Sequence, residues 1–207
     1  MNRKRRLVFG VGINDANYCV QRHEAKSGRQ RIIWSCPYYG KWRQMLKRCY
    51  SQIYQRKFPT YVGCEVSNEW LRFSVFRAWM EEQDWEGMCL DKDIIFVGNK
   101  IYSDKTCTFI PDWLNKFFNY RDSGRGVYMI GASWHSGHKK FQSYCGDPTS
   151  GKTLHLGYFE TQEGASAAWV KAKADICVKI CEKGIVRDSL VPAIMRHRDF
   201  ILTKTPH

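Results

Sequence analysis

The sequence predicts an α+β protein in which a helical and ββα block is followed by a three-stranded antiparallel sheet packed on one helix. Two helical patterns come first, because apolar residues recur at helical period over 41–54 and 67–80. Short β-prone runs bounded by turn residues follow over 89–110 and again over 127–159. The composition suits a folded chain, since 43% of the 207 residues are hydrophobic and 14% are aromatic, too many for disorder.

The first two helices are predicted from their apolar faces. One spans 41–54, and the other follows the capping run S-N-E at 67–69. The residues on the first face are Trp42, Met45, Leu46, Cys49, Tyr50 and Ile53, and those on the second are Trp70, Phe73, Phe76, Trp79 and Met80. Both faces are expected to form core.

Residues 89–118 predict the order strand, turn, strand, helix. The first strand covers 89–97, a Gly-Asn turn stands at 98–99, the return strand covers 101–110, and Pro111 opens a short helix.

A second β-prone segment predicts three strands and a helix. The runs over 127–130, 141–145 and 153–159 are separated by dense turn residues, and a helix opens at Thr161. Its apolar face comprises Ala165, Ala168, Trp169, Ala172, Ile176 and Ile180. The strands are therefore expected to pack on this helix.

The sequence predicts a basic N-terminal arm over 1–36, a block over 37–120, a second block over 125–182 and an extension over 183–207 that has no clear assignment. The arm carries eight Lys and Arg against two acids, the first block twelve against ten, and 121–207 thirteen against eight. The net charge of +13 therefore lies mainly outside the first block, and a polyanion is the expected partner. Solubility alone is the alternative, and the arm either follows phosphates or is a loose extension.

The apolar runs and the cysteines exclude other classes. No run approaches the roughly 18–20 residues that span a bilayer, so no membrane partner is expected. The run over 7–13 is too short and glycine-rich for a secretory signal, which indicates an intracellular protein. The chain has nine cysteines, and this odd number argues against a disulfide framework. No cysteine spacing completes a four-ligand zinc site, although Cys64, Cys89 and Cys107 could converge in space.

Three motifs of the first block resemble HNH-type endonucleases carried by bacteriophages, many of them homing-endonuclease-like. The motifs are W-R-Q-M-L-K-R-C-Y (42–50), Y-V-G-C-E-V-S-N-E-W (61–70) and L-D-K-D-I-I-F-V-G-N-K-I-Y-S-D-K-T-C-T-F (90–109). The resemblance covers about 38–120. It implies a ββα element that holds Mg²⁺ or another divalent cation against the scissile phosphate while a histidine activates water.

The residues implied by this resemblance are, as metal ligands, Asp91, Asp93 and Asn115 and, as catalytic residues, Asp91, Lys92 and Asn99. Lys92 stands where the family has its general-base histidine, and no histidine occurs between His23 and His135. A lysine binds phosphate but is a poor base unless its pKa is strongly depressed. Cleavage and an inactive ββα scaffold therefore both stay open, as does an ordinary surface ion pair of Asp91 with Lys92.

Three motifs of the second block resemble the ethylene-response-factor type of DNA-binding domain. They are R-G-V-Y (125–128), K-K-F-Q (139–142) and L-G-Y-F-E-T-Q-E-G-A-S-A-A-W (156–169), and the resemblance covers about 125–180. It implies that the sheet lies in the major groove of double-stranded DNA, where cationic side chains reach base edges and phosphates. The implied DNA-binding residues are Arg125, Trp134, Lys139, Lys140, Gln142 and Lys152. The alternatives are that Trp134 is a core or hinge aromatic and that Lys139 and Lys140 belong to a solvated turn.

Together these features predict a phage-encoded DNA-binding protein of the HNH endonuclease type, in the cytoplasm of an infected bacterial host. As an enzyme it would be a metal-dependent DNA nickase or homing endonuclease. The alternative is a catalytically inactive DNA-binding or inhibitor protein that acts on host nucleic-acid machinery, including a host nucleic-acid enzyme. Charge favours binding over cutting, because the basic excess lies outside the block expected to hold the metal.

Overall fold

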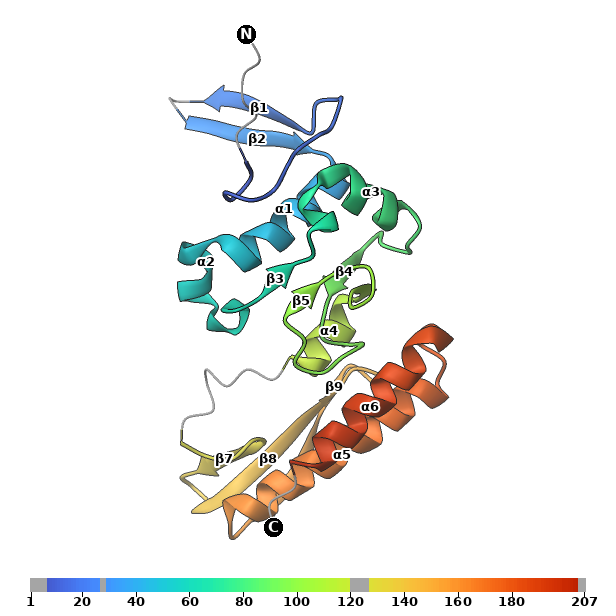
Figure 1. Ribbon diagram of the computed structural model, residues 1–207. Coiled ribbons are helices and arrows are strands. Elements are labelled where there is room, and N and C mark those ends of the chain that lie inside the picture. Colours follow the sequence, from blue (N-terminus) through green and yellow to red (C-terminus); the bar gives the residue numbers. More distant parts are fainter. Residues whose placement is uncertain (1–6, 27–28, 120–126, 205–207) are drawn as a thin grey trace. The chain divides into compact units, whose positions relative to one another are not determined.

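The computed structural model describes residues 7–26, 29–119 and 127–204, and the chain forms two compact units, Met1–Ile110 and Pro111–His207 (Figure 1). The predicted α+β class is confirmed, since helices are mixed with small sheets, one of them three-stranded, antiparallel and packed on a helix. Among the helices of the described residues, none combines the length and apolar composition that crossing a membrane requires.

The N-terminal region, considered above as a loose extension, is folded where the structure describes it. Strands β1 (Gln21–Lys26) and β2 (Arg29–Ser35) form an antiparallel hairpin. A bulge between Arg22 and His23 shifts the register, so outward and inward positions do not alternate regularly along the sequence. This shift explains why the segment shows no strand period.

The residues before the hairpin are pinned to the core of the first unit. The Ile13 N–H donates to the Leu71 carbonyl at 2.8 Å, and the Phe73 N–H donates to the Ile13 carbonyl at 3.0 Å. Gly12 passes so close to the next helix that a Cβ there would lie 2.4 Å from Leu46 Cδ1. Glycine is therefore required where the N-terminal segment crosses that helix.

Helix α1 (Pro37–Tyr50) buries most of the predicted apolar face, namely Trp42, Met45, Leu46 and Cys49. The predicted end of this helix is wrong, because Ser51 interrupts it. The Ser51 hydroxyl accepts the Tyr54 N–H at 3.4 Å and begins α2 (Gln52–Lys57). Ile53 consequently leaves the core face and is 81% exposed.

The core of the first unit is aromatic, and a buried indole hydrogen bond joins two distant segments inside it. Trp42 Nε1 donates to the Trp70 carbonyl at 2.7 Å, so the indole N–H is satisfied inside the core. The buried members of the second predicted face join it: Trp70, Phe73, Phe76 and Met80.

Helix α3 (Phe73–Glu81) begins later than the sequence predicts and is capped by a distant residue. The predicted capping run at 67–69 leads instead into a 3-10 turn. Asp15 Oδ1 accepts the Ser74 N–H at 2.9 Å, and Oδ2 accepts the Ser74 hydroxyl at 2.7 Å. Partial burial of Asp15 opposes its ionisation, but the hydrogen bonds from Ser74 outweigh that effect and lower its pKa.

Four short strands complete the first unit as two separate pairs. Strand β3 (Glu65–Val66) runs parallel to β5 (Ile101–Tyr102), whereas β4 (Met88–Asp91) pairs with β6 (Thr108–Pro111). The strand predicted over 89–97 therefore ends with β4, and the predicted return strand is divided between two sheets.

The boundary between the units separates β4 and β6 from the helix predicted to complete a ββα element. Helix α4 (Asp112–Phe118) follows β6 directly in the chain but belongs to the second unit. The linker expected over 121–126 lies outside the described residues.

All nine cysteines are free thiols. Cys49, Cys64 and Cys107 are buried in the core of the first unit, whereas Cys89 is only half-buried. Burial, with Cys64 nearby, raises the pKa of Cys49 to about 12. These thiols consequently act as small apolar core groups.

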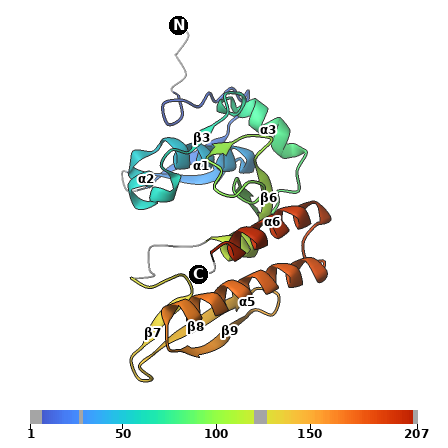
Figure 2. The same cartoon turned by 60° about the horizontal axis from the view of Figure 1, so that its bottom comes forward.

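The second unit is built on a sheet with the order β7 (Ala132–His135), β8 (Lys140–Asp147), β9 (Lys152–Phe159). Helix α5 (Gln162–Glu182) covers one face of this sheet, and α6 (Val191–Leu202) packs along α5 (Figures 1 and 2). The prediction of three strands packed on one helix is confirmed, but the first strand is not at 127–130 as predicted: those residues form turns, and β7 begins at Ala132. The extension over 183–207 supplies the additional helix α6.

Two buried charges fasten these elements together. Lys173 Nζ on α5 donates to the Phe117 carbonyl of α4 at 2.6 Å, and burial lowers its pKa to about 8. Asp147 at the end of β8 accepts Lys179 Nζ at 2.6 Å and the Thr149 N–H at 2.8 Å. Burial opposes the ionisation of Asp147, but these donors prevail and hold its pKa far below the usual range.

We expect Asp15→Ala to lower the free energy of unfolding by about 1 kcal/mol, because it removes the cap of α3. The contribution of Asp15 should be complete above the pKa that it has in the unfolded chain and should be lost as the pH falls through its lower folded pKa. Urea unfolding at neutral pH and near pH 3 measures both effects. Asp15→Asn, which keeps a capping oxygen, is the control. Equal stability of Asp15→Ala and the wild type at neutral pH would contradict the assignment.

Candidate nucleic-acid interface

The loop that leaves β4 is closed by its own first side chain. Asp91 Oδ1 accepts the N–H groups of Asp93 at 2.9 Å and Ile94 at 2.6 Å, which turns the chain and buries the Ile94 side chain. Burial raises the pKa of the Asp91 carboxyl, although the two N–H groups act in the opposite direction. Asp91 is thus directed toward the backbone of its own loop.

Lys92 is a buried cation with a local counter-charge. Its residue is 5% exposed, and its Nζ donates to both carboxylate oxygens of Asp93, at 2.7 and 2.8 Å, and to the Asn99 carbonyl. The alternative of a surface ion pair between Asp91 and Lys92 is corrected in two respects: the lysine is buried, and its ion-pair partner is Asp93.

Asn99 ties the two ends of the loop together. Its Nδ2 donates to the carbonyls of Lys92 at 2.9 Å and Ile101 at 2.6 Å, and its Oδ1 accepts the Ile101 N–H at 3.1 Å. The implied catalytic residues therefore lie together, but each is engaged by the loop that contains it.

The implied metal ligands do not fit a divalent cation in this arrangement. The Asp93 carboxylate faces an ammonium group, Asp91 Oδ1 holds two N–H groups, and Asn115 belongs to α4 in the other unit. In the part of the chain that the structure describes, no group of three His, Cys, Asp or Glu side chains is arranged to hold a metal ion.

The three-stranded sheet offers a different kind of surface, because among the described elements of its own unit α5 packs on one face and the other face carries exposed side chains. Along β8, Ser143, Cys145 and Asp147 are buried, whereas Tyr144 and Gly146 between them are exposed. The odd-numbered positions of β8 thus share the face covered by α5, and the even-numbered positions form the open face.

The register assigns the implied DNA-binding residues to different faces. Lys140 and Gln142 occupy the open face of β8, whereas Trp134 pairs with Phe141 and so shares the covered face. Trp134 is nevertheless 44% exposed and contacts Phe141 edge-on at 5.1 Å, which places it at a margin of that face. Lys152 pairs with Asp147, also on the covered side, where it remains exposed in the hairpin.

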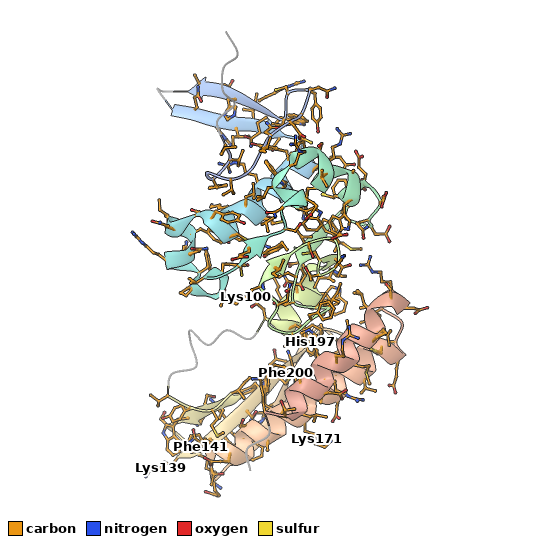
Figure 3. All side chains as sticks on the ribbon, viewed as in Figure 1. Lys100, Lys139, Phe141, Lys171, His197 and Phe200 are labelled. Carbon is orange, nitrogen blue, oxygen red and sulfur yellow. The ribbon has the colours of Figure 1, made fainter. Side chains whose placement is uncertain are left out.

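Two of the implied DNA-binding residues, Lys139 and Arg125, are not in the strands of the sheet. Lys139 lies in the turn between β7 and β8 with a φ of 49°, near the end of the sheet marked by Phe141 (Figure 3). Arg125 lies outside the described residues.

The open face carries a group of rings that the sequence analysis did not identify. The group, called the ring cluster below, comprises His135, His138, Tyr144, His155 and Tyr158. Ring centroids are 4.6 Å apart for His135–His138, 4.3 Å for His138–Tyr158, 5.0 Å for His155–Tyr158 and 4.8 Å for Tyr144–His155. His135 Nδ1 also accepts the His138 N–H at 3.1 Å, which orients the first ring.

A bulge brings the ring cluster onto one face. Ser143 pairs with Gly157, but the next residue, Tyr144, pairs with His155, so that Leu156 has no partner in the ladder. Tyr158 and His155 are three residues apart, and in a regular strand residues at an odd spacing lie on opposite faces. The sequence therefore does not indicate that they share a face. Their common face depends on this bulge.

Lysines lie at both ends of the sheet, although among them only Lys140 is in the register of the open face. Lys139 and Lys140 are at the β7–β8 end, and Lys140 Nζ pairs with Glu160 at 2.7 Å. Lys152 and Lys183 are at the β8–β9 end, where Lys183 Nζ approaches the Thr149 carbonyl at 3.4 Å. These exposed pairs contribute little stability, so the ammonium groups are available for exchange with other anions.

Comparisons with protein families, with curated proteins and with solved structures each give no match to this chain. The residues of the open face therefore carry the functional argument.

We expect Asn99→Ala to lower the free energy of unfolding of the first unit by about 1–3 kcal/mol, because it leaves loop groups without their partners. Chemical denaturation followed by tryptophan fluorescence measures the loss. Asn68→Ala is the matched control, since Asn68 is exposed and its side chain makes no capping hydrogen bond. Equal stability of the two variants would show that the loop does not depend on Asn99.

Proposed function

We propose that this chain binds DNA through the open face of the β7–β8–β9 sheet and that the loop over 91–101 is structural. The observation that carries the proposal is the contrast between the two faces of the sheet. Helix α5 covers one face, whereas the other presents rings, the amide of Gln142 and Lys140, and further lysines lie exposed at the ends of the sheet. Side chains of these kinds contact bases, sugars and phosphates.

Charge supports a polyanionic ligand. The chain carries a net charge of +13, and residues 121–207 contain thirteen Lys and Arg against eight acids. Lysines at both ends of the sheet would each meet a backbone phosphate and release a bound counterion, which supplies affinity without regard to sequence. Binding of this kind requires no further cofactor.

Metal-dependent cleavage has less support from the same residues. A nuclease centre needs carboxylates free to coordinate a cation and a general base beside it. Here Asp91 and Asp93 are engaged within their own loop, and Lys92 in the place of the base is held by a carboxylate. The inactive DNA-binding alternative is therefore the proposed function.

We expect binding to a partial duplex with a single-stranded overhang to weaken steeply with salt. Lys139→Gln and Lys140→Gln should each reduce the slope of log K against log[salt] by about 0.7–0.9, the value for one lost phosphate contact. Fluorescence anisotropy at several salt concentrations measures the slope.

Lys171→Gln is the matched control for these lysines, because Lys171 is an exposed residue of α5 whose Nζ pairs with Asp175 at 3.0 Å (Figure 3). It should leave the slope unchanged. If Lys171→Gln and Lys139→Gln reduced the slope equally, the sheet would not be the contact surface.

Supercoiled plasmid with Mg²⁺ or Mn²⁺ is expected to be retarded by the protein in a gel at low salt and to remain un-nicked. Nicking by the wild type that disappears in Asp91→Ala would contradict the proposal and establish the endonuclease. Absence of binding to both the plasmid and the partial duplex even at low salt would exclude DNA as the ligand and favour a host nucleic-acid enzyme as the partner.

A further inference from the structure

We infer that the open face of the β7–β8–β9 sheet binds unpaired bases, so that the ligand is single-stranded nucleic acid and not the groove of a duplex. This inference rests on the proposed function and specifies its ligand. It depends on the ring cluster, on the other side chains that share its face and on the position of the lysines.

The ring cluster is both continuous and accessible. Tyr144 and Tyr158 are 44% and 39% exposed, and His155 lies between them at 4.8 and 5.0 Å. His135 and His138 extend the cluster beyond Tyr158, at 5.4 and 4.3 Å. Isolated exposed aromatics are common on proteins, but five rings in mutual contact on one open sheet face form a stacking surface.

Such rings are suited to the faces of bases. In a duplex each base is stacked between its neighbours and shows only its edges in the grooves. Aromatic side chains stack on bases when the strand is single and the bases can turn outward. Each stacked base strengthens binding by about 5- to 100-fold, with little dependence on its identity.

The same face is poorly supplied for reading a groove. Direct readout in the major groove relies most often on Arg or Lys held bidentately by guanine. Among the described residues on the open face there is no arginine, and Lys140 is drawn to Glu160 at its margin. Gln142 instead lies on the central strand opposite Tyr158, where its amide can both donate to and accept from the edge of an unpaired base.

The lysines fit the same ligand. An eight-residue strand such as β8 extends for roughly 25 Å, with Lys139 and Lys140 at one end. At the other end, Lys152 opens β9 on the covered side and is exposed at the edge of the sheet. A strand laid along β8 would place its bases on the rings between and its phosphates near the ammonium groups. The lysines complement the charge of the phosphates, and the ring cluster fits the bases. Together they identify single-stranded nucleic acid as the occupant.

The test measures binding of three fluorescent probes at one salt concentration: a thymidine strand of about 15 nucleotides, an abasic strand of equal length and a blunt duplex. The wild type should bind the thymidine strand about tenfold or more tighter than either of the others. Tyr144→Ala and Tyr158→Ala should each weaken binding of the thymidine strand by about 5- to 100-fold and leave binding of the abasic strand unchanged. Tyr158→Phe, which keeps the ring, should bind as the wild type does.

Tyr128→Ala is the matched control. Tyr128 is 37% exposed but contacts Phe141 on the covered face, so its removal should not alter binding of the thymidine strand. Thermal unfolding of each variant separates loss of fold from loss of contact.

Three results would overturn the inference: duplex binding as tight as that of the thymidine strand, equal losses of Tyr158→Ala on the thymidine and abasic strands, or an equal loss for Tyr128→Ala. If Lys139→Gln still reduces the salt dependence in those cases, the proposed function stands without the inference. Absence of binding to all three probes would contradict both the inference and the proposed function.

Discussion

The register shift in β9 determines the chemistry of the open sheet face. Tyr158 pairs with Gln142, but beyond the bulge His155, and not Leu156, pairs with Tyr144. With strict alternation the leucine would share the face of Tyr158, and the imidazole would turn toward α5. One extra residue therefore keeps an apolar side chain out of the open-face register and adds a ring in its place. The stacking surface depends on this single irregularity.

The covered face supplies the rigidity that the open face needs. Ser143 and Cys145 are buried on the side of α5, and Asp147 binds Lys179 of that helix. Gly131 approaches Trp169 of α5 so closely that a Cβ there would lie 2.2 Å from the Trp169 side chain. Because α5 holds the strands in place from the covered face, the rings of the open face can keep their positions while they remain exposed.

The first unit shows how the same residue types serve structure. Aspartate, lysine and asparagine between β4 and β5 suggest a metal site when only their spacing is known. In the fold, Asp91 turns the chain, Lys92 is buried against Asp93, and Asn99 joins the loop ends. A buried ammonium group requires such partners, since an unpaired charge away from water is strongly unfavourable. The loop satisfies its polar groups internally, and this leaves the basic excess elsewhere in the chain as the stronger indication of function.

The sequence by itself determined the α+β class, most of the core faces of α1 and α3, and a three-stranded sheet packed on α5, although not the position of β7, because helical period and turn residues are local signals. It also determined the basic charge and showed that the excess over the first block is small, twelve Lys and Arg against ten acids. Only the tertiary structure decided that Asp15 caps α3, that β1 and β2 pair, that Lys92 is buried and that five rings share one face. Each of these depends on contact between distant segments or on a register shift, and neither is encoded in the spacing of neighbouring residues.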